Sequence, residues 1–278
     1  MSEPIEVPQD ASTGFWRSVT VDLAHCLRFY SRLPVPVLPW EQNAHALPDF
    51  PRLVRVLPLA GFVLGILPAF ALALAHFLAL GPWLAAILAV AAATLTTGAF
   101  HEDGLADTAD SFGGSTRERR LEIMRDSRIG SFGASALFLA LLLRIGALAH
   151  VTMAAGWTAG VVAVPITAAL SRVAGLMPLV FLSFARIDGA AHAVGQPSRE
   201  SFWLAAGLAG LIAVALGLIG ALPPSGIALM IVLSGLVGWG FIRLADRHLG
   251  GQTGDIAGAT QQMAEIAALI GLLTALRP

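Results

Sequence analysis

The residues best suited to chemistry form an acidic cluster at positions 101–110. This stretch reads His-Glu-Asp-Gly-Leu-Ala-Asp-Thr-Ala-Asp and follows an apolar run long enough to cross a bilayer. If it continues as a helix, Asp103, Asp107 and Asp110 are spaced i, i+4 and i+7 and project from one face, with His101 on the opposite side. Carboxylates that share a face repel one another unless a cation sits among them, and hard cations such as Mg²⁺ take oxygen ligands. The spacing therefore predicts a Mg²⁺ site, the alternative being a solvated helix end at the membrane surface.

A second polar segment follows the acidic cluster. Arg125 and Arg128 flank Asp126, and Gly130 comes just before the next apolar stretch. Guanidinium groups and the free N–H groups of a helix start both bind phosphate oxygens, so this segment is a candidate phosphate site. The alternative is that the arginines only anchor the chain at the membrane surface.

A third polar segment leads into the last apolar stretch. It reads Gly-Gly-Gln-Thr-Gly-Asp at residues 250–255. Glycine-rich backbone at a helix start can approach a pyrophosphate closely, which makes Gly251, Thr253 and Gly254 candidate substrate contacts. Asp255 could add a metal ligand.

Three charged residues lie inside apolar stretches, where an isolated charge is costly. Glu265 is expected to face the interior and to have a partner. The same argument applies to Arg172 and, less strongly, to Arg144. Arg172 could pair with Glu265 or reach the polar site. The competing interpretation of such a pair is a purely structural buried ion pair.

Composition defines the class of protein. The chain is 56% hydrophobic and 13% charged, with a mean hydropathy of +0.75, as in a polytopic membrane protein. We expect an all-α, polytopic integral membrane helical bundle of about seven spans, with six and eight as alternatives. The candidate spans are 53–80, 83–100, 132–151, 161–184, 202–222, 227–241 and 259–276.

The N-terminal region is expected to differ from the rest. Residues 1–14 are predicted to be a disordered tail without a signal-peptide pattern, and 15–278 a single transmembrane catalytic domain. Residues 15–30 mix aromatic, charged and apolar side chains, which favours an amphipathic helix in the membrane interface. The single cysteine, Cys26, excludes an intramolecular disulfide.

The basic residues predict the orientation. The chain contains no lysine, so all 17 of its Lys and Arg residues are arginines. Most of these arginines lie in the N-terminal region or the longer loops, while the short turns near 81, 156 and 224 carry none. By the positive-inside rule the arginine-rich side is cytoplasmic. The acidic cluster would therefore act on the cytoplasmic face.

Taken together, the motifs resemble those of the cobalamin synthase family, the adenosylcobinamide-GDP ribazoletransferases. The resemblance covers nearly the whole chain after the first dozen residues. It rests on Phe-Tyr-Ser-Arg-Leu-Pro at 29–34, on the acidic cluster at 101–110, on Met-Arg-Asp-Ser-Arg-Ile-Gly at 124–130 with Gly133, and on the segment at 250–255. The first of these motifs adds Arg32 to the candidate substrate-binding residues.

The resemblance implies an activity and a location. A member of this family would join adenosylcobinamide-GDP to α-ribazole or its 5′-phosphate, release GMP and require Mg²⁺, in the bacterial inner membrane. Its partners would be the corrinoid nucleotide, the ribazole substrate and the lipid bilayer, but no nucleic acid. A homo-oligomer or an association with other enzymes of the cobalamin pathway is also expected.

On this interpretation the acidic cluster binds metal and handles a proton. Asp103, Asp107 and Asp110 would be Mg²⁺ ligands, or one of them the base that accepts the hydroxyl proton. Asp126 and Asp255 would be further ligands, and Arg125 and Arg128 would hold phosphate. His101 would act either as an orienting group or as a base.

Two other functions would account for part of the sequence pattern. A CDP-alcohol phosphotransferase of lipid synthesis also uses a series of aspartates, but the residues after Asp103-Gly104 lack the arginine of that motif and are more tightly spaced. A cation transporter would explain carboxylates in a membrane, yet these cluster at one face rather than at the midplane.

Overall fold

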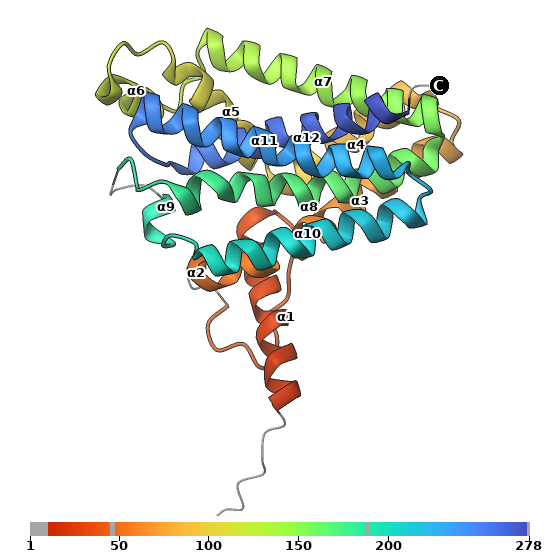
Figure 1. The fold of residues 1–278 in the computed structure, drawn as a ribbon, viewed down its shortest axis with the longest axis horizontal. Coiled ribbons are helices and arrows are strands. Elements are labelled where there is room, and N and C mark those ends of the chain that lie inside the picture. The colour runs from red at the N-terminus through yellow and green to blue at the C-terminus, as the bar shows by residue number, and fades with distance from the viewer. Residues whose placement is uncertain (1–10, 45–47, 187–189, 277–278) are drawn as a thin grey trace, which may run out of the picture.

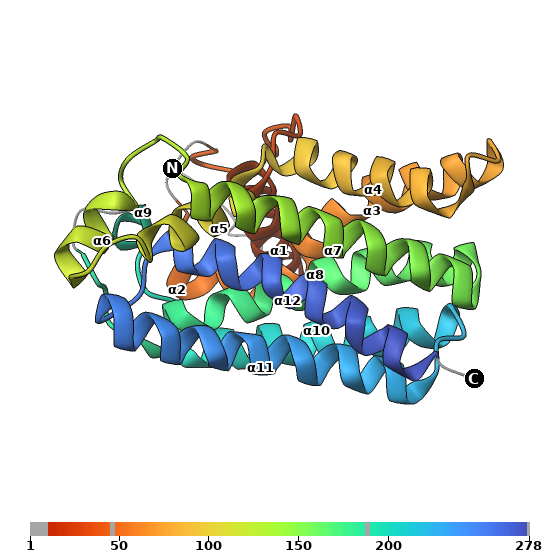
Figure 2. The same ribbon diagram turned by 90° about the horizontal axis from the view of Figure 1, so that it is seen from above.

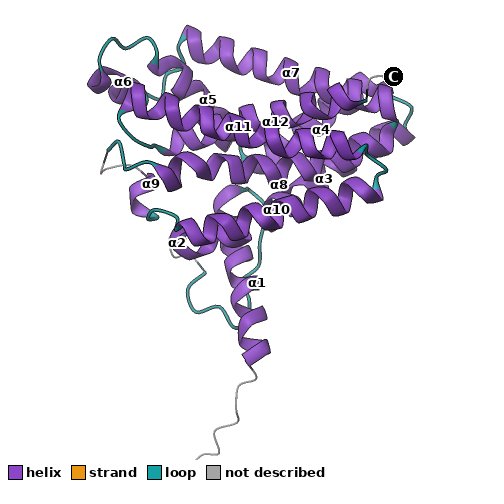
Figure 3. Ribbon diagram, in the orientation of Figure 1, coloured by secondary structure: helices purple, strands orange, loops and turns teal. Residues whose placement is uncertain are grey.

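The computed structural model describes residues 11–44, 48–186 and 190–276, and within these ranges it contains helices and no strand (Figure 3). The elements are α1 (Ala11–Tyr30), α2 (Phe50–Leu53), the 3-10 helix η1 (Val54–Val56), α3 (Leu57–Phe77), α4 (Gly81–Thr97), α5 (Phe100–Ser111), α6 (Arg117–Ile123), α7 (Ser131–Ala155), α8 (Trp157–Phe181), α9 (Ala190–Ala193), α10 (Arg199–Ile219), α11 (Pro224–Leu249) and α12 (Gly254–Ala275).

Six of the described helical segments are long and apolar enough to cross a membrane. They contain α3, α7, α8, α10, α11 and α12, and the bent pair of α4 and α5 brings the number to seven. The expected polytopic helical bundle is therefore confirmed. The span expected at 227–241 is longer than predicted, because α11 continues through its charged last turns to Leu249.

The spans run side by side, and α8 and α12 are the two whose apolar windows are most buried (Figures 1 and 2). Small residues let their backbones approach closely, as in other membrane bundles. A Cβ added at Gly175 of α8 would lie 2.9 Å from the carbonyl oxygen of Ala257 in α12. These two helices form the centre against which α3, α10 and α11 pack.

The acidic cluster does not continue the preceding span, contrary to the simplest extension of the sequence pattern. Gly98 (φ 64°) and Ala99 (φ 58°) are both left-handed, which ends α4, and α5 leaves it at 90°. Arg32 holds this break, since its backbone N–H donates to the carbonyl of Thr96 at 2.8 Å. This bend places α5 across the end of the bundle.

The amphipathic helix predicted at 15–30 is present as α1, but it begins at Ala11. The rest of the predicted tail, residues 1–10, lies outside the described residues. In Figure 1, α1 runs crosswise to the spans, as a helix in the plane of the membrane surface would. Asp22 of α1 forms ion pairs with Arg52 at 3.0 Å and with Arg55 at 2.8 Å, which tie the helix to the start of the first span.

Candidate active site

The acidic face of α5 meets the start of α12 at one end of the bundle. Gly104 makes this crossing possible, because a Cβ there would lie 2.8 Å from the carbonyl oxygen of Asp255. On the α12 side, Gly258 faces the backbone of His101 and Gly104. The acidic cluster and the segment at 250–255, which lie far apart in the sequence, are thus in contact.

Negative charge accumulates at this crossing. The carboxylates of Asp103, Asp110 and Asp255 lie close enough to Asp107 to repel it, and the guanidinium of Arg186 attracts it. Asp103 is exposed, whereas Asp107 and Asp255 are partly buried. The cluster therefore carries an excess of negative charge that faces an open end of the bundle.

Arg186 is the site residue that sequence reasoning missed. Its Nη2 donates to Oδ2 of Asp255 at 3.3 Å, while its Nη1 is buried and has no hydrogen-bond partner within the described parts of the chain. In the sequence, Arg186 is simply an arginine that follows an apolar span. A residue that only fixes the membrane orientation would have the same position, so the sequence does not distinguish the two roles. An unsatisfied buried guanidinium nitrogen beside carboxylates is a donor available to an anionic ligand.

Asp110 points toward α7 and caps it. Its Oδ2 accepts from the backbone N–H of Gly130 at 2.7 Å and its Oδ1 from that of Gly133 at 2.8 Å. A negative group at a helix N-terminus also interacts favourably with the helix dipole. Both oxygens of this predicted ligand thus stabilise the junction between α5 and α7.

The arginine segment after α6 lies on the surface. Arg128, whose side chain is 87% exposed, pairs with Asp126 at 2.6 Å. Hydrogen bonds from Arg128 lower the pKa of Asp126 to about 2. Asp126 and Arg128 are thus engaged with each other, and the backbone N–H of Arg125 donates to the carbonyl of Glu122 at 3.0 Å.

The glycine-rich segment joins two chain regions before α12 begins. Gln252 pairs with Phe184 in a single parallel bridge, and Gly251 lies against the backbone of Ser183 and Ala185. Thr253 caps α12 by accepting from the N–H of Ile256 at 3.2 Å.

Gly254 and His101 border an apolar pocket instead of the acidic face. A Cβ at Gly254 would meet open space, and both residues line a cavity between the end of α1, α8 and α12. The buried ring of His101 stacks parallel to that of Tyr30, with centroids 5.7 Å apart. Arg32, at the break between α4 and α5, packs against Gly98.

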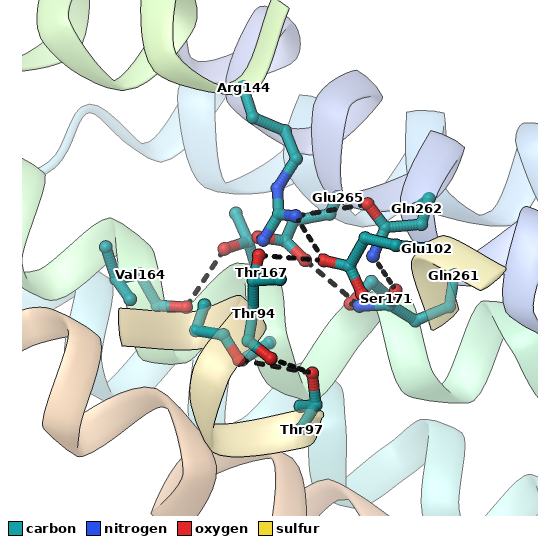
Figure 4. Close-up of polar contacts among 12 residues, drawn as sticks. Thr94, Thr97, Glu102, Arg144, Val164, Thr167, Ser171, Gln261, Gln262 and Glu265 are labelled. Atoms are coloured by element: carbon teal, nitrogen blue, oxygen red, sulfur yellow. Dashed lines mark hydrogen bonds and ion pairs between the residues drawn. The ribbon is translucent and has the colours of Figure 1, made fainter. Parts of the chain in front are cut away.

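A second polar cluster lies deeper in the bundle (Figure 4). Arg144 of α7 donates to Oε1 of Glu102 and to Oε1 of Glu265, each at 2.9 Å, and to Gln262 at 3.1 Å. Gln261 donates to Glu265 and to Ser171 at 3.0 Å each. We call this the Arg144 network, defined by Glu102, Arg144, Ser171, Gln261, Gln262 and Glu265.

The expectation that Glu265 is paired inside the bundle is confirmed, but its partner differs from the first candidate. The ion pair is with Arg144. Arg172 instead donates to the backbone carbonyl of Ala168 at 2.9 Å. The sequence analysis favoured the wrong arginine, because both arginines lie inside a span and the choice depends on how the helices are rotated.

The side chains at the crossing of α5 and α12 supply the type of ligand atom, oxygen, that a hard divalent cation prefers. Asp103, Asp107 and Asp255 supply carboxylate oxygens, and their mutual repulsion would be relieved by a cation. Among the described residues, however, no group of three His, Cys, Asp or Glu side chains is arranged closely enough to hold a metal. Mg²⁺ commonly takes only one or two carboxylates together with substrate phosphates and water, and this donor set fits that pattern.

The fold and the site define a polytopic helical membrane protein with a carboxylate-rich polar site at one end of its bundle. The model of the family described as Cobalamin-5-phosphate synthase matches residues 22–273, so the chain belongs to this family. No solved structure was found to match it.

Full-length relatives agree with the family match. The chain is similar to the "Adenosylcobinamide-GDP ribazoletransferase" of Azorhizobium caulinodans, with 48% identity over 94% of this chain and 98% of the relative. The proteins of the same name from Xanthobacter autotrophicus (46% identity, 92% and 96% coverage) and Rhizobium johnstonii (42%, 94% and 99%) are also similar.

Proposed function

We propose that this protein is a membrane transferase that joins adenosylcobinamide-GDP to α-ribazole or α-ribazole 5′-phosphate and releases GMP. Relatives with this name, aligned over nearly the whole of both chains, support the substrates. The observation in the structure that carries the proposal is the meeting of Asp103, Asp107, Asp255 and Arg186 where α5 crosses α12. Carboxylates with one arginine donor suit the transfer of a phosphate ester.

The reaction breaks the phosphoanhydride bond of the GDP group and forms a phosphate ester to the acceptor. A ribose hydroxyl of the acceptor attacks the phosphorus nearest the cobinamide, an O–P bond forms, and the bond from that phosphorus to the bridging oxygen of GMP breaks. The hydroxyl proton passes to a carboxylate, and GMP carries away the electron pair of the broken bond. Negative charge therefore grows on the diphosphate during the reaction.

The residues at the crossing would have different roles in this reaction. Asp107 or Asp103 would accept the hydroxyl proton, a role supported by the lack of an ion-pair partner for either side chain among the described ion pairs. Arg186 would hold the diphosphate through its unpaired Nη1. Asp103, Asp107 and Asp255 would hold Mg²⁺, which when bound would neutralise diphosphate charge.

We place the protein in the bacterial inner membrane with this site on the cytoplasmic face. The arginines of α6, Arg186, Arg243 and Arg247 lie at the same end of the chain's spans as the acidic crossing, as the positive-inside rule requires of a cytoplasmic face. A homo-oligomer, or an association with other enzymes of the pathway, stays a prediction that cross-linking in native membranes would test.

The activity is tested with purified protein in detergent. We expect GMP release that depends on both adenosylcobinamide-GDP and α-ribazole, stops with EDTA and returns with added Mg²⁺. A cation transporter or a CDP-alcohol phosphotransferase would not release GMP from these substrates. Release that is unaffected by EDTA would exclude the metal while leaving the transferase intact.

The orientation is tested by labelling cysteines introduced into Cys26→Ser protein. Ser115→Cys, in the loop after α5, should react with a membrane-impermeant maleimide only when the cytoplasmic side is accessible. Ser225→Cys, at the start of α11, should react only from the outside. Labelling of Ser115→Cys from outside would overturn the cytoplasmic placement of the site.

A further inference from the structure

An aromatic pocket lies beside the acidic crossing, between the end of α1, the starts of α5 and α12, and α8. Its rings come from Phe29, Tyr30, Phe50, Phe100 and His101. They form a connected set, with Phe29 and Phe100 5.6 Å apart and Tyr30 and Phe100 5.7 Å apart between centroids, edge to face. Several rings gathered round one cavity make a surface for a flat aromatic group.

One side of this pocket is polar and unsatisfied. Arg172 lines the pocket and is 6% exposed. Its Nη1 donates to the carbonyl oxygen of Ala168, but its buried Nε has no hydrogen-bond partner in the described part of the chain. A buried donor without an acceptor is costly, so the cavity is suited to a ligand that brings an acceptor.

The polar side chains that line the pocket are Tyr30, His101, Arg172 and Gln261. The amide nitrogen of Gln261 already donates to Ser171 and to Glu265, whereas Nε of Arg172 has no acceptor among the described residues. The pocket therefore favours a flat ligand that brings an acceptor to Arg172. A benzimidazole-type base is a flat, mainly apolar bicycle whose single free ring nitrogen accepts a hydrogen bond, and a hydrocarbon chain would leave the arginine unsatisfied.

The pocket is also correctly placed for an acceptor substrate. Phe100, Asp103 and Asp107 are spaced i, i+3 and i+7 on α5, so the pocket's ring and the two carboxylates share one face of the helix. On the other side Gly254, which lines the pocket, is followed directly by Asp255. A nucleoside whose base filled the pocket would direct its ribose toward the acidic crossing.

We propose that this pocket binds the base of the acceptor nucleoside, stacked among Phe29, Tyr30 and Phe100, with Arg172 donating to its free ring nitrogen. The proposal rests on the proposed function and specifies how that site selects its acceptor. It assigns Phe29, Phe100 and Arg172 to acceptor binding and leaves the corrinoid donor to other surfaces.

The first test measures steady-state kinetics of Phe100→Leu and Phe29→Leu. Each change keeps apolar volume and removes a ring, so KM for α-ribazole should rise about tenfold, while KM for adenosylcobinamide-GDP stays within twofold. Phe138→Leu, on an exposed face of α7, is the matched control and should leave both values unchanged. An unchanged KM for α-ribazole in both pocket variants would overturn the proposal.

The second test measures binding by calorimetry in detergent, without donor or Mg²⁺. The protein should bind benzimidazole riboside more tightly than indole riboside, which lacks the acceptor nitrogen, and Arg172→Met should abolish that preference. Equal affinity of the unaltered protein for both, or no binding, counts against the pocket. If Arg172→Met does not fold, the KM values for α-ribazole of Phe100→Leu and Phe29→Leu test the proposal instead. Absence of GMP release by the unaltered protein would instead refute the proposed function.

Discussion

Two clusters of carboxylate and arginine lie a few turns apart in this protein, and they differ in charge balance and in surroundings. In the Arg144 network, deep in the bundle, one guanidinium bridges Glu102 and Glu265, and amide side chains add further hydrogen bonds, although Oε2 of Glu102 and Nε of Arg144 have no partner among the described residues. At the acidic crossing, four aspartates, one of which caps α7, lie near a single arginine. The first cluster is largely satisfied by the protein itself, and the second needs positive charge from elsewhere.

The same residue types therefore have a structural role in the Arg144 network and a binding role at the acidic crossing. Glu102 and Asp103 are neighbours on α5, yet Glu102 is turned toward Arg144 and Asp103 is exposed. A helix places successive side chains about 100° apart, so adjacent carboxylates can serve the interior and the site respectively. Changes in the two clusters should accordingly affect different measurements.

The largest effect is expected in the Arg144 network. Arg144→Met leaves two carboxylates uncompensated in an apolar interior and should destabilise the protein by about 3–5 kcal/mol, measured by thermal unfolding in detergent. Adding Glu102→Gln and Glu265→Gln should recover most of the loss, because the buried charge disappears. No recovery in this triple variant would show that the network acts through something other than charge balance.

The opposite behaviour is expected at the acidic crossing. Asp107→Asn should lower GMP release on the order of a hundredfold or more, because the site would lose a carboxylate that holds Mg²⁺ or accepts the hydroxyl proton. Thermal stability should be unchanged or higher, since a repulsive charge is removed. Raised Mg²⁺ should restore part of the activity.

The matched control is Asp49→Asn, an exposed aspartate that makes no side-chain capping bond. It should leave turnover within about twofold, as surface substitutions usually do. Full metal-dependent activity in a variant with Asn at 103, 107 and 110 would remove these residues from the site and shift attention to Asp255.

A smaller effect is expected where the two clusters are joined. Gly104→Ala places a methyl group against the backbone of Asp255 and should cost about 1–3 kcal/mol of stability while also lowering turnover, because α12 must move away from α5. Gly146→Ala in α7 is the control, since its Cβ would meet only Trp83 at 3.9 Å. The control should be neutral or slightly stabilising. Equal behaviour of the two would mean that the crossing tolerates a wider separation.

The smallest effect is expected at Arg128. The sequence predicted a phosphate contact, but the side chain is paired with Asp126 at an exposed position. Arg128→Lys keeps the charge and should change KM for adenosylcobinamide-GDP by less than about twofold, as is usual for exposed pairs. A tenfold rise would restore Arg128 to the substrate site.

Much of this architecture could be predicted from the sequence. The apolar stretches gave nearly all the spans because their length matches the bilayer, and the carboxylate spacing on α5 is a local helical property. The bend at Gly98 and Ala99 was missed, since an apolar run carries no sign that one alanine will adopt a left-handed conformation. The cap made by Asp110, the Arg144 pairing and the role of Arg186 all depend on contacts between distant helices, which spacing does not reveal.

The position of α12 in the chain affects how the protein matures. This helix supplies Glu265 to the Arg144 network, Asp255 to the acidic crossing and Gln261 to the aromatic pocket, and it is the last of the described helices to leave the ribosome. Until α12 inserts, Arg144 lacks its ion pair with Glu265, and α5 lacks its packing contact with α12. Membrane insertion must therefore pass through an intermediate whose earlier helices are already in the bilayer while their polar groups lack the partners that α12 supplies.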